Sequence, residues 1–432
     1  MRARARQDSL PVVVEWGFGM VEYRGSRCGP YTVRSRDGIM NVLTLNAGSS
    51  SLKFKLLRMA GDESVLAQGQ VDQWGTPRAA MRLEVTGRAA ETTSVAAESV
   101  GHAVEHAIGA CRAMGIDAVG HRIVHGGSRF EAPARISDEV IAAIREVTEL
   151  APLQNGPGLT CIETQRRLLP DVPAFAVFDT AFHRTIPDVA ATYAIPLEVA
   201  QKHEIRRYGF HGTSHRYVSQ TLLAKIGRAP AGTRLVTCHL GNGASVCAIR
   251  DGQSVDTSMG MTPLEGLVMG TRCGDIDPGL LMYLMRTERI SVRELDDLLN
   301  RHSGLLGLSG RSSDVRELQA LAGGDARAEL ALEIFAYRVR KYIGAYAAIL
   351  GGLDAVAFSG GIGEHSSDMR QRICRGLEFL GAELDSSANA AAGGKACCKI
   401  GTDKSRVQIW VIPTDEELQI GRDVRELLQK PN

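Results

Sequence analysis

The stretch VLTLNAGSSSLKFKLL, residues 42–57, decides the fold. A short apolar run leads into a turn of small and polar residues, Asn46–Ser51, and an alternating run follows, which is the pattern of two strands joined by a turn. The pattern returns in residues 235–257, LVTCHLGNGASVCAIRDGQSVDT, with a turn at His239–Gly243 and a hairpin closed by Asp251–Gly252. This repetition, half a chain apart, indicates a duplication. The sequence therefore predicts an α/β protein of two related domains whose turns face a shared cleft.

The segments between these units predict helices and one further glycine turn. Residues 137–150 carry apolar residues at helical spacing behind a capping serine or aspartate, and a longer helical stripe over residues 331–350 stops at Gly351. A strand at residues 355–358 follows, then the glycine turn Ser359–Glu364 and another helix. In α/β proteins this order of elements holds a ligand at the carboxyl end of a sheet.

The composition excludes several classes of function. The 432 residues are too many for one ordinary core, and 44% hydrophobic with 23% charged residues is usual for globular proteins. The formal net charge of +1 predicts no general attraction to nucleic acid, and no apolar run reaches the ~18 residues of a membrane span. The nine cysteines include no C-x-x-C pair, so we expect reduced thiols in a cytoplasmic protein.

The first 39 residues differ from the rest of the chain. They are rich in arginine and lack helical or strand periodicity, and Pro11, Glu15 and Gly17 interrupt the apolar run that a secretory signal needs. Their acidic residues argue against a transit peptide. We expect residues 1–39 to be a disordered extension or the product of an upstream start codon, with the working protein beginning at Met40.

Phosphate binding must use the turns, because the chain has neither a Walker A motif nor a G-x-G-x-x-G motif. The segment Asn46–Lys53 offers hydroxyls, a glycine and a lysine, and the glycines of residues 241–243 and 360–363 let the backbone approach a ligand closely. Each of these turns, taken alone, also fits an ordinary structural turn.

Ionisable residues stand out in four further segments: His121–Gly127, Phe178–His183, Tyr208–His215 and Thr271–Pro278. Arginines that neutralise phosphoryl oxygens and a carboxylate that positions the acceptor or Mg²⁺ are what phosphoryl transfer needs. Any one of these residues also fits a surface salt bridge. His211 and His215 have the spacing of a metal site on a helix, but the glycines beside them favour a loop.

Nine segments resemble, in order, the signature segments of the acetate kinase family: Asn46–Lys53, His121–Gly127, Phe178–His183, Arg207–His215, His239–Gly243, Asp256–Pro278, Ser303–Arg316, Phe358–Glu364 and Pro413–Glu417. That family belongs to the actin-like ATPases and sugar kinases. The resemblance therefore implies two duplicated ribonuclease-H-like domains with an interdomain cleft, assembled as a homodimer. The expected domains are residues 40–185 with the C-terminal helix 416–432, and a nucleotide-binding and dimerisation domain at residues 186–415.

The resemblance also implies the roles of single residues. Asn46 and Glu416 would organise Mg²⁺, with Mn²⁺ as an alternative. Arg122 and Arg272 are expected to bind the acetate carboxylate and the transferring phosphoryl group. Asp179 is expected to be the essential acidic residue, and His211 to stabilise the transition state. The acid-binding site would consist of Arg122 and of four residues that line the pocket of the methyl group: Val124, Leu153, Phe210 and Pro263.

The expected nucleotide site is larger. The phosphates of ATP or ADP would contact the two polar turns, through Lys53, His239, Leu240, Gly241, Asn242 and Gly243. The adenosine would contact two later segments, through Asp314, Val315, Arg316, Gly361, Ile362, Gly363, Glu364 and His365.

The activity that the resemblance implies is the reversible transfer of the γ-phosphoryl group of ATP to acetate by direct in-line displacement. Propionate and butyrate are alternative acceptors. An actin-like ATPase or nucleotide-switched binding protein without acyl transfer is the alternative from another class. The chain departs from the family at His365, commonly asparagine, and at Gln154, usually histidine. Gln154 has two possible roles. It faces the phosphoryl group, where it can donate a hydrogen bond but cannot carry the positive charge of a protonated histidine, or it fixes a turn at Leu153–Gly158.

Overall fold

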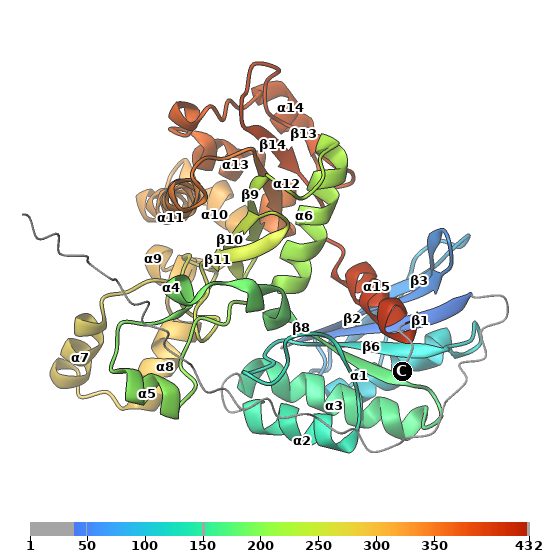
Figure 1. The fold of residues 1–432 in the computed structure, drawn as a ribbon. Coiled ribbons are helices and arrows are strands. Elements are labelled where there is room, and N and C mark those ends of the chain that lie inside the picture. Colours follow the sequence, from blue (N-terminus) through green and yellow to red (C-terminus); the bar gives the residue numbers. More distant parts are fainter. Residues whose placement is uncertain (1–38, 49, 149–151, 430–432) are drawn as a thin grey trace, which may run out of the picture. The chain divides into compact units, whose positions relative to one another are not determined.

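The computed structural model describes residues 39–48, 50–148 and 152–429 (Figure 1). All described elements belong to a compact unit that spans residues 35–432. The predictions about an N-terminal extension fall on residues 1–38, which lie outside the described part. No helix within the described ranges is both long enough and apolar enough to cross a membrane.

The described strands form two sheets. The first has the order β5-β4-β3-β2-β1-β6-β8-β7 and the second the order β11-β10-β9-β12-β14-β13. The bounds in the first sheet are β1 Met40–Ala47, β2 Ser51–Met59, β3 Glu63–Asp72, β4 Ala80–Val85, β5 Glu91–Ser94, β6 Ala118–Ile123, β7 Ala134–Arg135 and β8 Ala174–Phe178. Those in the second are β9 Arg234–Leu240, β10 Ala244–Arg250, β11 Gln253–Thr257, β12 Ala355–Ser359, β13 Cys398–Lys399 and β14 Gln408–Val411.

The two sheets repeat one topology. In the first, β3, β2 and β1 are antiparallel neighbours, and β6 and β8 then continue parallel to β1. In the second, β11, β10 and β9 are antiparallel, and β12 and β14 continue parallel to β9. Each predicted strand–turn–strand unit therefore forms the antiparallel part of its sheet, and the orders β3-β2-β1-β6-β8 and β11-β10-β9-β12-β14 correspond. The predicted duplicated α/β fold is confirmed.

Helices cover both faces of the first sheet. Neighbouring residues of a strand point to opposite faces. Accordingly, Val42 packs in one apolar cluster with Ile420 and Val424 of α15 (Glu416–Gln429), whereas Leu43 packs with α1 (Val100–Arg112). The C-terminal helix thus returns to the strand with which the sheet begins, and this return brings Glu416 to the end of β1.

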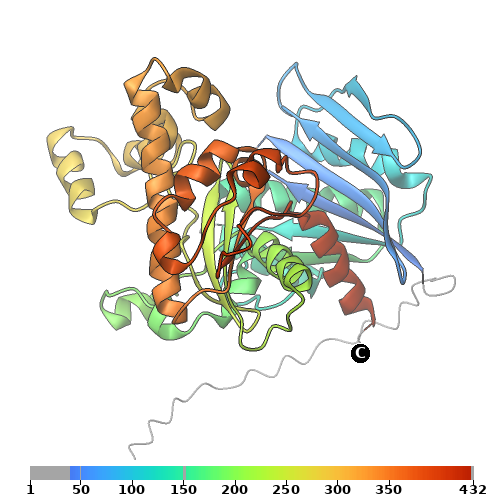
Figure 2. The same cartoon turned by 90° about the horizontal axis from the view of Figure 1, so that it is seen from above.

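The second sheet is also covered on both faces. Its Leu235 packs with Val218 and Leu222 of α6 (Gly212–Ile226), whereas Val236 packs with α11 (Ala326–Leu350), the long orange helix of Figure 2. The predicted end of this helix is confirmed, because Gly351 caps it in the left-handed conformation. The predicted helix behind Ser137 is also confirmed, as α2 (Asp138–Val147).

The remaining helices within the described ranges connect the elements of the two sheets. They are α3 Pro152–Leu168, η2 Asp179–Thr185, α4 Asp188–Ala191, α5 Leu197–Lys202, α7 Pro278–Thr287, α8 Val292–Arg301, α9 Gly304–Ser309, α10 Val315–Ala322, α12 Gly360–His365, α13 Ser367–Cys374, η3 Glu378–Leu380 and α14 Ser386–Ala391.

Three local predictions are wrong for a shared reason. The segment Leu153–Gly158 is part of helix α3 and not a turn, α6 begins at Gly212, inside the predicted loop, and α12 begins directly at Gly360. Glycine and proline usually indicate irregular backbone, but here they lie within helices. An added Cβ atom at Gly212 would lie 1.9 Å from the carbonyl oxygen of Asp179, so a close backbone contact accounts for that glycine, and Pro157 lies inside α3.

Candidate active site

An arginine and an aspartate meet at the carboxyl ends of two parallel strands. Arg122 lies near the end of β6, and Asp179 directly follows the neighbouring strand β8. The Arg122 Nε atom donates to Asp179 Oδ1 at 3.1 Å, and Nη2 donates to Oδ2 at 2.5 Å. Asp179 is fully buried and also accepts a hydrogen bond from the Thr213 hydroxyl at 2.8 Å. Burial opposes the charge of Arg122, but the Asp179 and Glu416 carboxylates outweigh it and raise the arginine pKa.

Asn46, at the end of β1, links this pair to the start of helix α15. Its Oδ1 atom accepts from Arg122 Nη1 at 3.0 Å, and its Nδ2 atom donates to Glu416 Oε2 at 2.9 Å and to Glu417 Oε1 at 3.0 Å. Glu416 Oε2 also lies 3.5 Å from Arg122 Nε. The structure thus brings the two predicted metal residues into contact, and it adds Glu417, to which the sequence analysis gave no role.

These oxygen atoms suit a hard divalent cation. The described residues contain no group of three or more His, Cys, Asp or Glu side chains arranged to hold a metal ion. Mg²⁺ does not require one, because it usually binds one or two carboxylates together with water and substrate phosphates. Asn46, Glu416 and Glu417 fit that mode of binding, and Mn²⁺ takes the same kind of ligand.

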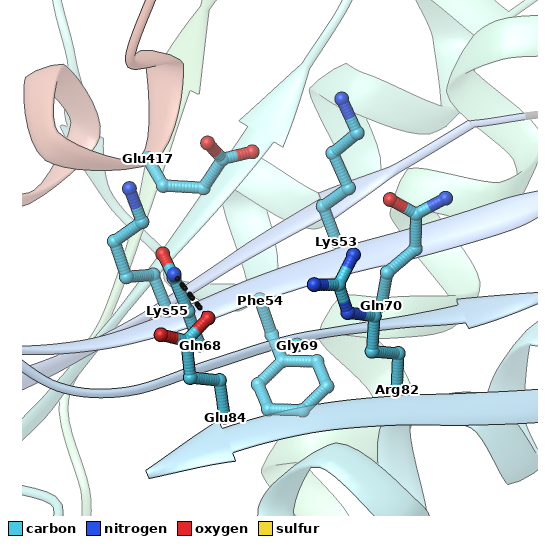
Figure 3. A pocket seen from close by; sticks show the side chains of 9 residues that line it. All are labelled: Lys53, Phe54, Lys55, Gln68, Gly69, Gln70, Arg82, Glu84 and Glu417. Carbon is cyan, nitrogen blue, oxygen red and sulfur yellow. Dashed lines mark hydrogen bonds between the residues drawn. The ribbon is translucent and has the colours of Figure 1, made fainter. Parts of the chain in front are cut away.

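Lys53 lies apart from the other predicted nucleotide residues. It pairs with Asn46 across the β1–β2 hairpin, but its side chain lines a pocket of about 240 Å³ with Gln70, Arg82 and Glu417 (Figure 3). Lys53 therefore shares a pocket with Glu417 and not with the other predicted nucleotide residues. Its contact with phosphate stays a prediction.

Two histidines stack on each other, His211 just before α6 and His239 near the end of β9. His211 precedes helix α6 in the left-handed conformation (φ 57°), and its ring stacks on that of His239 with centroids 4.4 Å apart. Its Nδ1 atom lies 2.9 Å from the Ser245 hydroxyl. Burial, followed by the charges of His239 and Arg122, lowers the pKa of His211 well below its ordinary value. Burial therefore favours the neutral imidazole of His211.

Arg272 is a buried cation beside His211. Among the residues that the structure describes, no carboxylate lies within 4 Å of its guanidinium group, and Nη1 donates to the Pro263 carbonyl at 2.6 Å. Burial lowers the pKa of Arg272 to about 10. A Cβ atom added at Gly243 would lie 2.8 Å from Arg272 Nη2 and 3.4 Å from His211 Nε2. Arg272, His211 and the β9–β10 turn therefore converge on one point that suits an anion.

Arg207 donates several hydrogen bonds to the loop that carries Pro263. Arg207 Nη1 donates to the carbonyl oxygens of Thr257 and Met259, both at 3.1 Å, and Nη2 donates to Glu265 at 2.6 Å. The Tyr193 hydroxyl donates to the other Glu265 oxygen. Neither Glu265 nor Tyr193 was predicted from the sequence, because their contribution depends on contacts between distant segments.

The predicted methyl pocket is only partly described. Val124 and Phe210 belong to one buried apolar cluster, and the Asn155 side chain fixes the backbone of His125 through two hydrogen bonds of 2.9 Å. The side chains of residues 152–154 lie outside the described part of the structure, so the predictions for Leu153 and Gln154 fall there.

Most of the predicted nucleotide residues line one pocket of about 600 Å³. The pocket is bounded by Gly241, Asn242, Ser313, Asp314, Val315, Arg316, Gln319, Gly361, Ile362, His365 and Ser366. Leu240 is buried beneath it, and Gly363 is buried within α12. Glu364 instead accepts from the Gly360 and Thr414 backbone amides at 2.8 and 3.0 Å, which joins the start of α12 to the segment before α15. Ser313, Gln319 and Ser366 were not predicted, although they neighbour predicted residues in sequence or in space.

The model of the acetokinase family matches residues 41–422. The chain belongs to the acetokinase family. It is 46% identical to an acetate kinase of Acetivibrio thermocellus over 402 residues, which cover 90% of this chain and all of the relative. The predicted family is confirmed.

Solved structures of the acetokinase family superpose closely on this chain. A Porphyromonas gingivalis acetate kinase has a TM-score of 0.83 at 43% identity and covers 90% of this chain and 100% of its own. A Francisella tularensis propionate kinase also has a TM-score of 0.83, at 38% identity, and covers 89% of this chain and 98% of its own.

In this member of the acetokinase family, two buried arginines lie near one histidine. Arg122 and Arg272 supply positive charge from two different segments, and His211 lies within electrostatic reach of both. Buried cations of this kind stabilise negative charge far better than exposed ones, because little water screens them.

Proposed function

We propose that this chain is an acetate kinase, which transfers the γ-phosphoryl group of ATP to acetate and forms acetyl phosphate and ADP, or runs the reverse reaction. The observation that supports the proposal is that Arg122 and Arg272 both act on His211, and that Arg272 and His211 lie beside Gly243, next to the Gly241–Asn242 edge of the pocket of about 600 Å³. A nucleotide in that pocket would have the glycine turn Gly241–Gly243 on the path from its adenosine to these cations.

The proposed chemistry needs no general base, because acetate is already an anion at neutral pH. The difficulty is the repulsion between acetate and the γ-phosphoryl group. Arg122 and Arg272 offset it by holding negative oxygens of both partners, and His211 donates a hydrogen bond to the transferring group. Asp179 fixes the orientation of Arg122. Direct in-line transfer follows, without a covalent enzyme intermediate.

Asn46, Glu416 and Glu417 are the proposed residues for Mg²⁺. The bound ion would neutralise charge on the nucleotide phosphates. Asn46 has a second role, because its hydrogen bond from Arg122 couples the metal residues to the acid-binding arginine.

The proposal is tested by trapping acyl phosphate with hydroxylamine in the presence of ATP, Mg²⁺ and acids of increasing length. We expect hydroxamate formation to be fastest with acetate, slower with propionate and poor with butyrate, because Val124 leaves little room for another methylene, which is worth ~1–3 kcal/mol of discrimination. Val124→Ala should narrow the difference between acetate and propionate. A wild-type preference for propionate would identify a propionate kinase, and ATP hydrolysis without hydroxamate would identify an ATPase.

Gln154 offers a separate test of the acid site. If it faces the phosphoryl group, Gln154→His should raise turnover several-fold and add a dependence on a group that titrates near neutral pH. Unchanged turnover without a new pH dependence would leave Gln154 with a structural role.

We also propose a cytoplasmic homodimer with the domain boundaries given by the family resemblance. Helix α7 supports dimer formation, because Leu280, Met282 and Tyr283 are exposed and none of its residues is buried in the single chain. Met282→Asp with Tyr283→Ser should shift the mass measured by light scattering from dimer to monomer. A monomeric wild type would contradict this part of the proposal.

A further inference from the structure

A chain of hydrogen bonds runs from the centre of the second sheet to His211. The Thr237 hydroxyl lies 2.8 Å from His215 Nδ1, His215 Nε2 lies 2.8 Å from the Ser245 hydroxyl, and that hydroxyl lies 2.9 Å from His211 Nδ1. Thr237 and His215 are 1% exposed and Ser245 is 0% exposed. Water therefore has no access to the three inner members, and they must satisfy one another.

The far end of this chain determines its direction. A buried hydroxyl hydrogen needs an acceptor. Among the described residues, the Thr237 hydroxyl has one hydrogen-bond partner, His215 Nδ1, so its hydrogen must point there. His215 then carries its proton on Nε2 and donates it to Ser245. The Ser245 hydrogen is left for His211 Nδ1.

We infer that Thr237, His215 and Ser245 form a positioning relay that keeps the proton of His211 on Nε2. A neutral imidazole has one N–H group, so the nitrogen that accepts from Ser245 cannot also donate. The Nε2 atom is the one beside Gly243 and Arg272. With its proton there, His211 adds a second donor next to the Arg272 guanidinium, and the described residues place no acceptor between them.

The opposite direction would weaken this anion site. His211 would then carry its proton on Nδ1, and a lone pair on Nε2 would face the transferring group and repel it. The low pKa of His211 gives the relay its importance, because a protonated imidazole would donate from both nitrogens whatever Ser245 did. The catalytic part of this inference rests on the proposed phosphoryl transfer, whereas the proton position does not.

The test uses the full chain with ¹⁵N-labelled histidine and a matched pair of variants at the remote end of the relay. Thr237→Val keeps the shape of the side chain and removes the hydroxyl, whereas Thr237→Ser keeps the hydroxyl. Long-range ¹H–¹⁵N spectra of the ligand-free protein report which nitrogen of His211 carries the proton, and a His211→Asn sample assigns its signals.

We expect wild type and Thr237→Ser to carry the His211 proton on Nε2, and Thr237→Val to show a mixture of the two tautomers. Thr237→Val should also lower kcat about tenfold, less than the 10²–10³ of an outright donor loss, with the KM for acetate unchanged. Ser245→Ala should have the same effect through a different member of the relay.

A wild-type His211 protonated on Nδ1 would overturn the relay. So would a Thr237→Val protein with an unchanged tautomer, or one with a changed tautomer and normal kcat. Failure of the proposed function is a separate result, because it appears as absent hydroxamate formation in the wild type.

Discussion

Five strands of each sheet have the same order, but the residues at the ends of these strands differ between the two sheets. In the first sheet, the ion pair Arg122–Asp179 lies at the carboxyl ends of β6 and β8. In the second, the turn after β9 and the start of α12 after β12 present glycines, Gly243 and Gly360, where an added Cβ atom would lie 2.8 and 2.7 Å from other atoms. A duplicated fold can therefore place a charged pair at the ends of the strands of one sheet and tightly packed glycines just after the strands of the other.

This difference fits the two proposed tasks. Acetate and a transferring phosphoryl group are small anions, so charged side chains with fixed positions control them best. A nucleotide is large, and its phosphates bind to backbone amides that only glycine-rich turns bring close enough. Substitutions at each end, with measurements of turnover, stability and nucleotide affinity, test whether the two ends have separate tasks.

Asp179→Asn should have the largest effect. The amide keeps the shape of the side chain but leaves Arg122 as a buried charge without its main partner, which is strongly destabilising for the local arrangement. We expect turnover in the hydroxamate assay to fall by about 10³ or more. Asp138→Asn removes the charge of an exposed ion pair with Arg166 and should leave turnover unchanged.

Near-normal turnover of Asp179→Asn would show that the first sheet's charge is dispensable. That result would also show that the Arg122–Asp179 ion pair is not needed for phosphoryl transfer.

Gly360→Ala tests the backbone end. Gly360 has φ +73°, and an added Cβ atom would meet the Leu240 backbone, so we expect a loss of about 2 kcal/mol or more in stability. Gly361 is the matched control, because a Cβ atom there would meet nothing within 4 Å. Denaturant unfolding should therefore show a lower midpoint for Gly360→Ala and an unchanged midpoint for Gly361→Ala. Equal midpoints would refute the requirement for glycine at residue 360.

Three buried histidines also favour the neutral form in the folded protein. Burial lowers the pKa of His121, His125 and His183 to about 4. In the unfolded chain they titrate near 6.5, so stability is full above that pH and falls as the pH drops from 6.5 towards 4. Each contributes a loss of about 1.4 kcal/mol at about pH 5.5.

The measurement is the free energy of unfolding as a function of pH. His121→Leu removes one of these groups, so its stability should fall less steeply between pH 6.5 and 5. A slope equal to that of the wild type would show that His121 is protonated in the native protein.

Truncation to a chain that begins at Met40 should have the smallest effect. The residues of both functional ends lie after Met40, so we expect unchanged turnover and melting temperature. A large loss in either quantity would show that residues 1–39 contribute to the fold or to the site.

The sequence was sufficient for features that depend on neighbouring residues. The hairpins β1–β2 and β9–β10 were predicted because their alternation is local, and α11 was predicted through its cap at Gly351. The start of α6 was missed, because the reason for Gly212 is a contact with the backbone of Asp179, 33 residues earlier in the sequence.

The site was predictable only in part, for the same reason. Arg122 and Asp179 became candidates through the family's segments, since each alone resembles a surface ion pair. Glu417, Ser245 and Glu265 received no role, because Glu417 meets Asn46 across 371 residues, and the other two act through a histidine and an arginine that folding brings to them. Such contacts leave no local pattern in the sequence.

The most direct test of the division between the two ends is calorimetric titration of Asp179→Asn with ADP, without Mg²⁺. We expect an ADP Kd within about twofold of the wild-type value, because Asp179 is not among the residues that line the pocket and substitutions without shared partners act independently. This near-normal affinity should accompany a turnover lowered by about 10³. An ADP affinity weakened tenfold or more would contradict the account, since the charged end would then be part of the nucleotide site.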